Sequence, residues 1–328
     1  MTVSRPAIAA LGAGRMGRGI ATAFAYAGHD VAIVDFKSRS ENQFHALAGD
    51  ALREIRNTLL SLARFGLLTP EDAERVLARV RVIPESEAGE TLRAAAIIFE
   101  GVPEVVDLKR DALARASRLA GPEPIIASTT STILVDDLSG AVERPERFLN
   151  AHWLNPAYLV PLVELSPGKA TDPAVTTRVK AMLESIGKVP VVCAARPGFI
   201  VPRIQSLAMN EAARMVEEGV ASAEDIDKAV IYGFGFRFAV LGLLEFIDWG
   251  GGDILHHASR YLVEALGDSR YAAPEIIATN MREGRIGMKT GQGFMNYEGV
   301  DQAAYREKRL AAFASALRAM GLAREPVA

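Results

Sequence analysis

The segment Ile8-Ala-Ala-Leu-Gly12-Ala-Gly14-Arg-Met-Gly17-Arg-Gly19 decides how the first half of this chain folds. Its four apolar residues predict a buried strand, and the glycine-rich turn leads directly into a predicted helix over residues 17–27. Gly12, Gly14 and Gly17 have the spacing G-x-G-x-x-G. The first glycine permits a tight turn, the second leaves room for a pyrophosphate, and the third lets helix and strand pack closely. In this setting the motif predicts a dinucleotide-binding βαβ unit.

The next predicted strand narrows the choice of nucleotide. Val31–Asp35 is apolar until its final aspartate, which lies about 20 residues beyond the turn. A carboxylate there accepts hydrogen bonds from the ribose hydroxyls and repels a 2′-phosphate. We therefore expect NAD, with the backbone at Arg15 and Met16 facing the phosphates at the start of the helix. Lys37 and Arg39 follow closely, so NADP stays open.

The rest of the first half alternates short apolar runs with longer helical patterns, which is typical of a parallel sheet built from βαβ units. Further strands are predicted at Ala95–Phe99, Ile125–Ser128, Phe148–His152, Pro161–Leu165 and Val189–Cys193. The stretch between residues 35 and 95 is too long for one crossover helix, so we expect a helical excursion there. Thr69 before Pro70 marks a helix start within it, because threonine caps helices and proline fits the first helical position.

Helical patterns dominate after Pro197-Gly198, and no convincing strand follows. A capping residue at Ser222 and apolar faces near residues 204–215 and 310–320 predict amphipathic helices. We therefore expect an α/β fold. A Rossmann-type, mostly parallel sheet domain covers residues 1–195, and an all-α domain covers residues 196–328.

Composition limits the function classes. The chain has 328 residues, 37 basic and 40 acidic side chains, and a formal net charge of −3. This balance argues against a nucleic-acid partner, since such proteins concentrate positive charge. No run reaches the ~18 apolar residues of a membrane span. Met1-Thr-Val-Ser-Arg-Pro leads straight into a strand, so we expect neither a cleaved leader nor a membrane partner. Cys193, the sole cysteine, excludes an internal disulfide and a cysteine metal cluster and favours a cytoplasmic location.

A nicotinamide enzyme that oxidises an alcohol needs a base beside the hydroxyl, and histidine suits this work near neutral pH. Among the five histidines, His152 ends a predicted strand, and ligands bind at the carboxyl ends of such strands. Glu164 lies in the next apolar strand, where a buried carboxylate needs a partner. If the two strands are adjacent, Glu164 can orient the His152 ring and stabilise its charged form. A purely structural histidine is the alternative.

Several motifs together resemble the 3-hydroxyacyl-CoA dehydrogenase family over nearly the whole chain. Besides the nucleotide turn they are His152-Trp-Leu-Asn155-Pro156 with Glu164, Phe99-Glu-Gly-Val-Pro-Glu104 with Lys109, Ala127-Ser-Thr-Thr-Ser131-Thr, Pro197-Gly-Phe-Ile200 and Gly287-Met-Lys-Thr-Gly-Gln-Gly-Phe294. The resemblance implies NAD, a small-molecule substrate, a homodimer and a role in fatty acid metabolism. It also implies a helical second domain like that of 6-phosphogluconate dehydrogenase.

The resemblance further implies roles for single residues. His152 would be the general base, Glu164 its partner, and Ser131 a hydroxyl that binds the substrate oxygen, while Asn155 would help shape the site. The alternative for Ser131 is a turn-forming hydroxyl in a Thr/Ser-rich loop.

Two further residues match family positions that lie along the cofactor. These are Glu104 and Lys109. The alternative for Lys109 is a solvated residue on a helix surface.

The chain departs from the family pattern in two places. Pro202 stands where the family usually has an asparagine that meets the substrate, so that side-chain hydrogen bond is missing or is supplied elsewhere. The stretch Gly233-Phe-Gly-Phe-Arg237-Phe-Ala-Val-Leu-Gly242 resembles the lambda-crystallin, or L-gulonate 3-dehydrogenase, branch and the similar carnitine dehydrogenases. Arg237 is well shaped to clamp a substrate carboxylate, and a surface or inter-subunit ion pair is the alternative.

These observations lead to one main hypothesis and two competitors. The main one is NAD-dependent oxidation of the 3-hydroxyl of a 3-hydroxyacyl-CoA, such as 3-hydroxybutyryl-CoA, to the 3-keto product. The first competitor is a dehydrogenase of a free small β-hydroxy acid of the L-gulonate or carnitine type. The second is a catalytically silent, crystallin-like NAD-binding protein.

Overall fold

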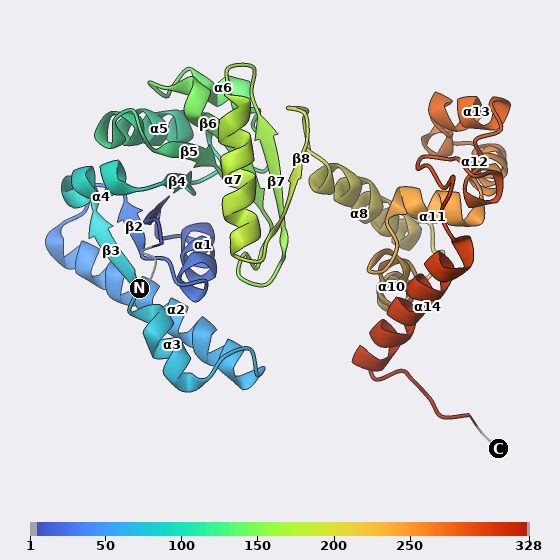
Figure 1. Cartoon of the computed structure of the whole chain (residues 1–328), viewed down its shortest axis with the longest axis horizontal. Coiled ribbons are helices and arrows are strands. Elements are labelled where there is room, and N and C mark those ends of the chain that lie inside the picture. The colour runs from blue at the N-terminus through green and yellow to red at the C-terminus, as the bar shows by residue number, and fades with distance from the viewer. Residues whose placement is uncertain (1–4, 327–328) are drawn as a thin grey trace. The chain divides into compact units, whose positions relative to one another are not determined.

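The computed structural model describes residues 5–326 and divides into two compact units, the first ending at Ala208 and the second beginning at Met209 (Figure 1). The division falls within α8 (Val201–Glu217). The boundary predicted between residues 195 and 196 lies in the loop that precedes this helix. Residues 1–4, on which the expectation about a leader partly rests, lie outside the described residues.

The strands of the first unit are short and form one sheet. They are β1 (Ile8–Leu11), β2 (Val31–Asp35), β3 (Val80–Pro84), β4 (Ile97–Glu100), β5 (Ile125–Ser128), β6 (Phe148–Trp153), β7 (Leu162–Pro167) and β8 (Val189–Val192). They pair in the order β3-β2-β1-β4-β5-β6-β7-β8. Only the β6–β7 pair is antiparallel. The predicted Rossmann-type, mostly parallel sheet is confirmed, because apolar runs buried on both faces form its central strands.

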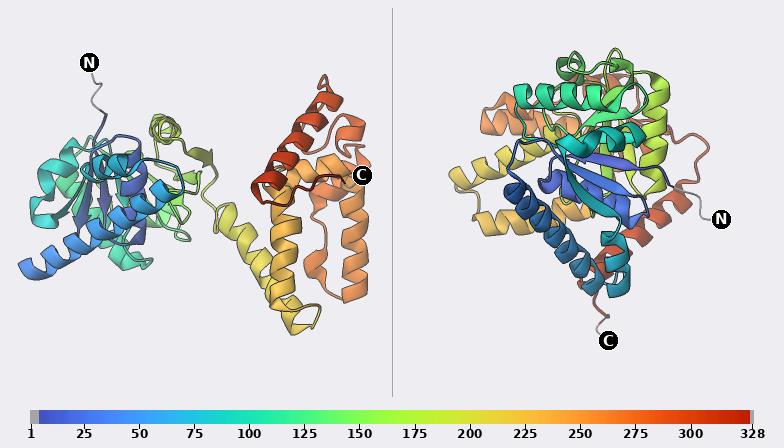
Figure 2. Two further views of the ribbon diagram at one scale, coloured as in Figure 1. Left: turned by 90° about the horizontal axis from the view of Figure 1, so that it is seen from below. Right: turned by 90° about the vertical axis from the view of Figure 1, so that its left-hand side faces the viewer.

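Helices pack on both faces of this sheet over two separate hydrophobic clusters (Figure 1 and Figure 2). One face is covered by α1 (Arg15–Tyr26), α2 (Glu41–Arg64), α3 (Pro70–Leu77) and α7 (Pro173–Ser185). The other is covered by α4 (Ala88–Ala94), α5 (Val106–Ala120) and α6 (Val135–Ser139). Helix α1 therefore begins at the glycine turn and lies against the sheet.

The expected helical excursion between residues 35 and 95 is only partly correct. Helices α2 and α3 lie there, and Thr69 caps α3 as predicted, but the chain then adds strand β3, which the sequence analysis missed. This strand pairs with β2 alone, at the sheet edge, and only Val80 in it is buried. Its sequence lacks the continuous apolar run of the central strands. Pro84, which has no N–H to donate, is tolerated at such an edge.

The second unit is helical, as predicted. It contains α9 (Ala223–Ala229), a π-helical segment (Val230–Gly235), α10 (Phe236–Phe238), α11 (Leu243–Gly250), α12 (Gly252–Leu266), α13 (Glu275–Arg282) and α14 (Gln302–Ala319). Ser222 caps α9 by accepting a hydrogen bond from the Asp225 N–H. Within residues 5–326, no single helix is long and apolar enough to span a membrane. The segments over 223–238 and 243–250 meet those criteria only as a pair, and they are bent by 82°.

The parallel strands bring the functional segments of the first unit to one edge of the sheet. The glycine turn follows β1, Gly101 follows β4, Thr130 and Ser131 follow β5, and Asn155 follows β6. The carboxyl ends of strands in open α/β sheets are where ligands bind. The candidate site is therefore assembled from these four loops.

Candidate active site

Steric contacts explain the three glycines of the nucleotide turn. Gly12 has a φ of +93°, and a Cβ there would lie 3.3 Å from the carbonyl oxygen of Gly101. A Cβ on Gly17 would lie 2.0 Å from the Gly12 oxygen, so only glycine lets α1 begin this close to β1. Gly14 is the N-cap of α1, and a Cβ there would meet no atom within 4 Å. The space beside Gly14 is therefore open to a ligand.

The start of α1 has the electrostatics of an anion site. Neither a capping side chain nor an acidic residue stands in its first turn. The N–H groups at Arg15 and Met16 therefore lie at the positive end of the helix dipole without a capping acceptor. A pyrophosphate suits this position, since phosphates commonly bind at such helix starts.

An open cleft of about 550 Å³ extends from this turn to the end of β2. Asp35 is buried there, and its carboxylate accepts hydrogen bonds from Nε of Arg39 at 2.6 Å and from the Lys37 N–H at 3.3 Å. The cleft falls in the usual size range of cofactor pockets. A glycine cradle, free N–H groups and a ribose-binding carboxylate together fit NAD. Arg39 beside Asp35 is also the residue that would meet a 2′-phosphate.

The central feature of the site is the pair His152 and Glu164. They stand opposite one another in the antiparallel β6–β7 register, and both are buried. Nδ1 of His152 lies 2.7 Å from Oε2 of Glu164. Because a carboxylate only accepts, Nδ1 donates its proton to Glu164 and Nε2 keeps its lone pair. Strands β6 and β7 are therefore adjacent, as the predicted contact between His152 and Glu164 requires. The pair has the geometry of an oriented general base.

Glu164 also holds the start of α8. Its Oε1 accepts hydrogen bonds from the N–H groups of Ile200 and Val201, each at 2.9 Å. Burial raises the pKa of Glu164, but the hydrogen bonds from His152, Val201 and Ile200 outweigh it, so the pKa lies below its ordinary value. Glu164 is therefore ionised at neutral pH.

The histidine ring has a second contact, which was not predicted from the sequence. Phe199 stacks on His152 with ring centroids 5.4 Å apart and an interplanar angle of 21°. Its φ is +43°, an unusual value for a residue other than glycine. The spacing of residues in the sequence does not predict this contact, because it joins two distant segments that only the fold brings together. Phe199 limits the directions that the ring can take.

Glu104 organises the loop that carries Ser131. Its Oε1 accepts hydrogen bonds from the Ser131 N–H at 2.9 Å, from the Thr132 N–H at 3.1 Å and from the Thr130 hydroxyl. Burial raises the pKa of Glu104. The Thr130 hydrogen bond, the nearby Lys109 charge and the loop N–H groups lower it by more, so the pKa lies below its ordinary value. The Ser131 side chain is exposed at the carboxyl-end edge of the sheet. This exposure is compatible with both readings of Ser131.

Lys109 is not a solvated helix residue, so that alternative from the sequence is wrong. The side chain is 1% exposed, and Nζ lies 2.9 and 3.1 Å from the carboxylate oxygens of Glu100, which is 0% exposed. Nζ also donates to the Val102 carbonyl at 3.2 Å and lies 3.4 Å from Glu104. Ser128 donates to Glu100 as well. Glu100, held by Lys109, therefore joins the ends of β4 and β5.

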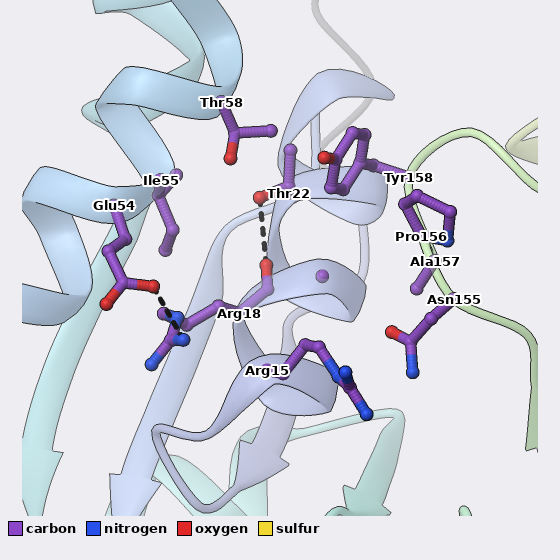
Figure 3. Close-up of a pocket in the computed structure, with 11 residues that line it drawn as sticks. Arg15, Arg18, Thr22, Glu54, Ile55, Thr58, Asn155, Pro156, Ala157 and Tyr158 are labelled. Carbon is purple, nitrogen blue, oxygen red and sulfur yellow. Dashed lines mark hydrogen bonds and ion pairs between the residues drawn. The ribbon is translucent and has the colours of Figure 1, made fainter.

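Asn155 lies on the loop between β6 and β7 and faces a second pocket, of about 330 Å³, beside α1 and α2 (Figure 3). The path of this loop is held by Lys188, whose Nζ donates to the carbonyls of Ala157 at 2.6 Å and Val160 at 2.8 Å. Lys188 is 8% exposed, and burial lowers its pKa to about 8. This buried cation was not singled out from the sequence.

Arg237 lies in α10 of the second unit. Its side chain is exposed, its guanidinium lies 5.6 Å from the ring centroid of Phe246, and it forms no ion pair within the described part of the chain. Among the described residues, Arg237 therefore does not serve as an intrachain ion-pair partner. Pro202 is the second residue of α8, a first-turn position that proline tolerates.

The motif over residues 287–294 has a structural explanation. Asp248 is buried, and its carboxylate accepts hydrogen bonds from the N–H groups of Phe294 at 2.9 Å and Met295 at 2.8 Å. A Cβ on Gly293 would lie 2.1 Å from Oδ1 of Asp248, and one on Gly287 would lie 2.3 Å from its carbonyl oxygen. The glycines of this motif let the loop close around Asp248.

Comparison with known proteins agrees with this geometry. Residues 7–196 match the family model for the 3-hydroxyacyl-CoA dehydrogenase NAD-binding domain, and residues 198–297 match the model for its C-terminal domain. A 3-hydroxybutyryl-CoA dehydrogenase from Bradyrhizobium diazoefficiens is 33% identical over 89% of this chain and 95% of its own. The lambda-crystallin homolog of Bos taurus is 34% identical over 77% of each chain.

A solved structure agrees over a still larger share of the chain. The crystal structure of a 3-hydroxyacyl-CoA dehydrogenase from Archaeoglobus fulgidus has a TM-score of 0.75 and 31% identity, and it covers 97% of this chain and 100% of its own. Fold, cofactor cradle and sequence therefore agree. The chain belongs to the 3-hydroxyacyl-CoA dehydrogenase family, whose members are NAD-dependent oxidoreductases acting on CH–OH groups.

Proposed function

We propose that this enzyme oxidises the 3-hydroxyl of a 3-hydroxyacyl-CoA, such as 3-hydroxybutyryl-CoA, to the 3-keto thioester. The observation that carries the proposal is the contact between His152 and Glu164, because it supplies an oriented base where NAD chemistry needs one. The Bradyrhizobium diazoefficiens relative, named for this substrate, supports the choice of a four-carbon thioester.

His152, Glu164 and Ser131 have separate roles in this reaction. Nε2 of His152 takes the proton of the substrate hydroxyl as the C3–H bond breaks. NAD, held by the glycine turn and Asp35, would supply the acceptor for the hydride from C3. The ionised carboxylate of Glu164 stabilises the imidazolium, and the Ser131 hydroxyl donates a hydrogen bond to the substrate oxygen. In the reverse direction His152 returns the proton.

The test is a His152→Ala variant compared with a His45→Ala control, since His45 is exposed on α2. We expect kcat for NAD reduction with 3-hydroxybutyryl-CoA to fall by about 10²- to 10⁴-fold in His152→Ala, the usual range for loss of a general base. The NADH dissociation constant should stay within about twofold of wild type, because His152 lies outside the nucleotide cleft. Near-normal turnover in His152→Ala would contradict the proposal.

A free β-hydroxy acid is the second candidate substrate. Pro202 at the start of α8, the exposed Arg237 and the similarity to the lambda-crystallin homolog favour it. Comparing kcat/KM for 3-hydroxybutyryl-CoA with the values for 3-hydroxybutyrate, L-gulonate and carnitine distinguishes the two candidate substrates. If Arg237 binds a free carboxylate, Arg237→Met raises KM for the acids and leaves the thioester unaffected. Failure to reduce NAD with the whole panel would instead point to a catalytically silent protein.

We also propose that the chain forms a homodimer through its helical unit. Large apolar side chains there are widely exposed, among them Met209 at 67%, Ile254 at 62%, Tyr261 at 70% and Leu310 at 59%. Exposed apolar surface on this scale is typical of association sites. Light scattering on purified protein should give twice the chain mass. Tyr261→Glu combined with Leu310→Glu should shift it toward the monomer.

A further inference from the structure

Arg15 is the exposed cation of the pocket beside α1. It lies in the first turn of this helix, and its guanidinium points across the pocket toward Asn155 (Figure 3). Tyr158 lines the same pocket, but its hydroxyl points toward Thr22, away from Arg15 and Asn155. Within residues 5–326, none of these three side chains has a hydrogen-bond or ion-pair partner in the protein. Arg15 and Asn155 thus bring two unpartnered hydrogen-bond donors together at one end of the pocket.

The charge of the pocket is not balanced. Its other arginine, Arg18, is paired with Glu54 at 2.6 Å and also donates to the Ala13 carbonyl at 2.6 Å. Glu54 is the sole acid among the residues that line the pocket. Arg15 therefore leaves one uncompensated positive charge there. Arginine binds carboxylate and phosphate oxygens in a bidentate geometry that suits this arrangement.

The pocket adjoins the nucleotide cleft at Arg18, which lines both, but is otherwise lined by different residues. The cleft between the glycine turn and Asp35 is lined by Gly12, Gly14 and Arg18 but not by Arg15, whereas the pocket is lined by Arg15 and Asn155 but by neither of those glycines. Asn155 follows His152 by three residues, a span of at most ~11 Å even in a fully extended chain. The pocket thus extends from the nucleotide cleft to the loop that follows the base.

We propose that Arg15, with Asn155, binds an anionic oxygen group of the hydroxy substrate. The ligand class is a carboxylate or phosphate attached to the carbon skeleton that carries the reacting hydroxyl. The proposal rests on the proposed function, since it concerns the substrate of the same site. Arg15 is then a specificity-determining residue, and the pyrophosphate of NAD is bound by the backbone of the glycine turn instead.

The experiment compares wild type with Arg15→Met, Arg15→Lys and the control Arg178→Met, since Arg178 is an exposed residue of α7 that lines neither pocket. Binding of acetoacetyl-CoA, acetoacetate and the uncharged N-acetylcysteamine thioester of acetoacetate is measured by calorimetry with NAD⁺ present, since the oxidised cofactor does not react with a 3-keto ligand, and NADH binding is measured separately. We expect Arg15→Met to weaken binding of one or both anionic ligands by roughly 10- to 100-fold, the range for loss of a charged hydrogen bond. Arg15→Lys should recover part of the affinity. The uncharged thioester and NADH should bind as in wild type.

The other outcomes either identify the source of the anion or contradict one of the proposals. A selective effect on acetoacetyl-CoA identifies the phosphates as the source of the anion, and a selective effect on acetoacetate identifies a free carboxylate. Weaker NADH binding in Arg15→Met, or equal loss for charged and uncharged ligands, overturns the proposal. So does a wild-type protein that binds neither anion. If wild type binds the anions through Arg15 but turns over no hydroxy substrate, the proposed function fails while the anion site stands.

Discussion

Glu164 divides its carboxylate between two tasks: Oε2 lies 2.7 Å from Nδ1 of His152, and Oε1 accepts the N–H groups of Ile200 and Val201 at the start of α8. The orientation of the catalytic ring is therefore coupled to the place where the helix begins. A change at Glu164 affects both the chemistry and the path of the chain that leads into α8.

Replacing Glu164 by Gln should separate these two tasks. The amide oxygen of Gln can still accept a hydrogen bond, but the charge that stabilises the imidazolium is lost. We expect kcat to fall by about two to four orders of magnitude, by analogy with other carboxylate–histidine pairs, while NADH binding changes little. Steady-state kinetics and NADH fluorescence titration measure the two effects. A kcat within threefold of wild type would show that the charge of Glu164 is not used.

Stability in acid should depend on the same carboxylate. The pKa of Glu164 is lowered in the folded protein, since its hydrogen bonds outweigh the opposing effect of burial. Its contribution is therefore fully present above the ordinary value of 4.5 and is lost as the pH falls through the lowered pKa. Urea unfolding between pH 7 and pH 3 should show a steeper loss of unfolding free energy in wild type than in Glu164→Gln. Parallel curves would contradict this assignment.

Lys188 should give a pH dependence of the same sign in an alkaline window. Burial lowers its pKa to about 8 from an ordinary value of 10.5, so between these values the unfolded chain binds more protons than the folded one. Unfolding free energy should therefore rise with pH in this window, by at most about 1.4 kcal/mol per unit. In Lys188→Met this rise should be absent. Because Lys188 bonds to the loop that carries Asn155, the variant should also have a higher substrate KM.

The buried pair of Lys109 and Glu100 should be essential to stability. In Lys109→Met the Glu100 carboxylate is left buried without its cation, which typically costs about 3–5 kcal/mol. Thermal unfolding should show a large drop in Tm for this variant. Adding Glu100→Gln should recover part of it, since the uncompensated charge is removed. A Tm for Lys109→Met close to that of wild type would mean that Lys109 contributes little to holding these loops.

Ser131→Ala should decide between the two readings of that residue. As a donor to the substrate oxygen, the hydroxyl should contribute to kcat, and its loss should lower kcat about 10- to 100-fold with little change in Tm. As a turn-forming hydroxyl it should affect Tm and leave kcat nearly unchanged. Thr132→Ala is the control for a structural hydroxyl in this loop, because the Thr132 hydroxyl donates to Glu104, whereas Ser131 contacts Glu104 through its backbone N–H. Kinetics and thermal unfolding of the two variants give the answer.

Local pattern was sufficient for the sheet domain and its cofactor cradle. The run Ile8–Leu11 and the glycines after it specify a strand, a tight turn and a helix through short-range sterics, so their geometry follows from neighbouring residues. The edge strand β3 was not predicted, because local pattern alone does not identify it. It is half exposed, and its identity as a strand comes from pairing with β2 rather than from its own apolar residues.

The sequence by itself determined the chemical inventory of this protein: a glycine turn, an acid on the second strand, one well-placed histidine and one acid in the next strand. Only the tertiary structure decided how these residues act. The β6–β7 register sets His152 against Glu164, the fold stacks Phe199 on the ring, and burial pairs Lys109 with Glu100. The physical reason is that each contact joins segments distant in sequence, and their energies depend on burial and on directions that no local spacing encodes.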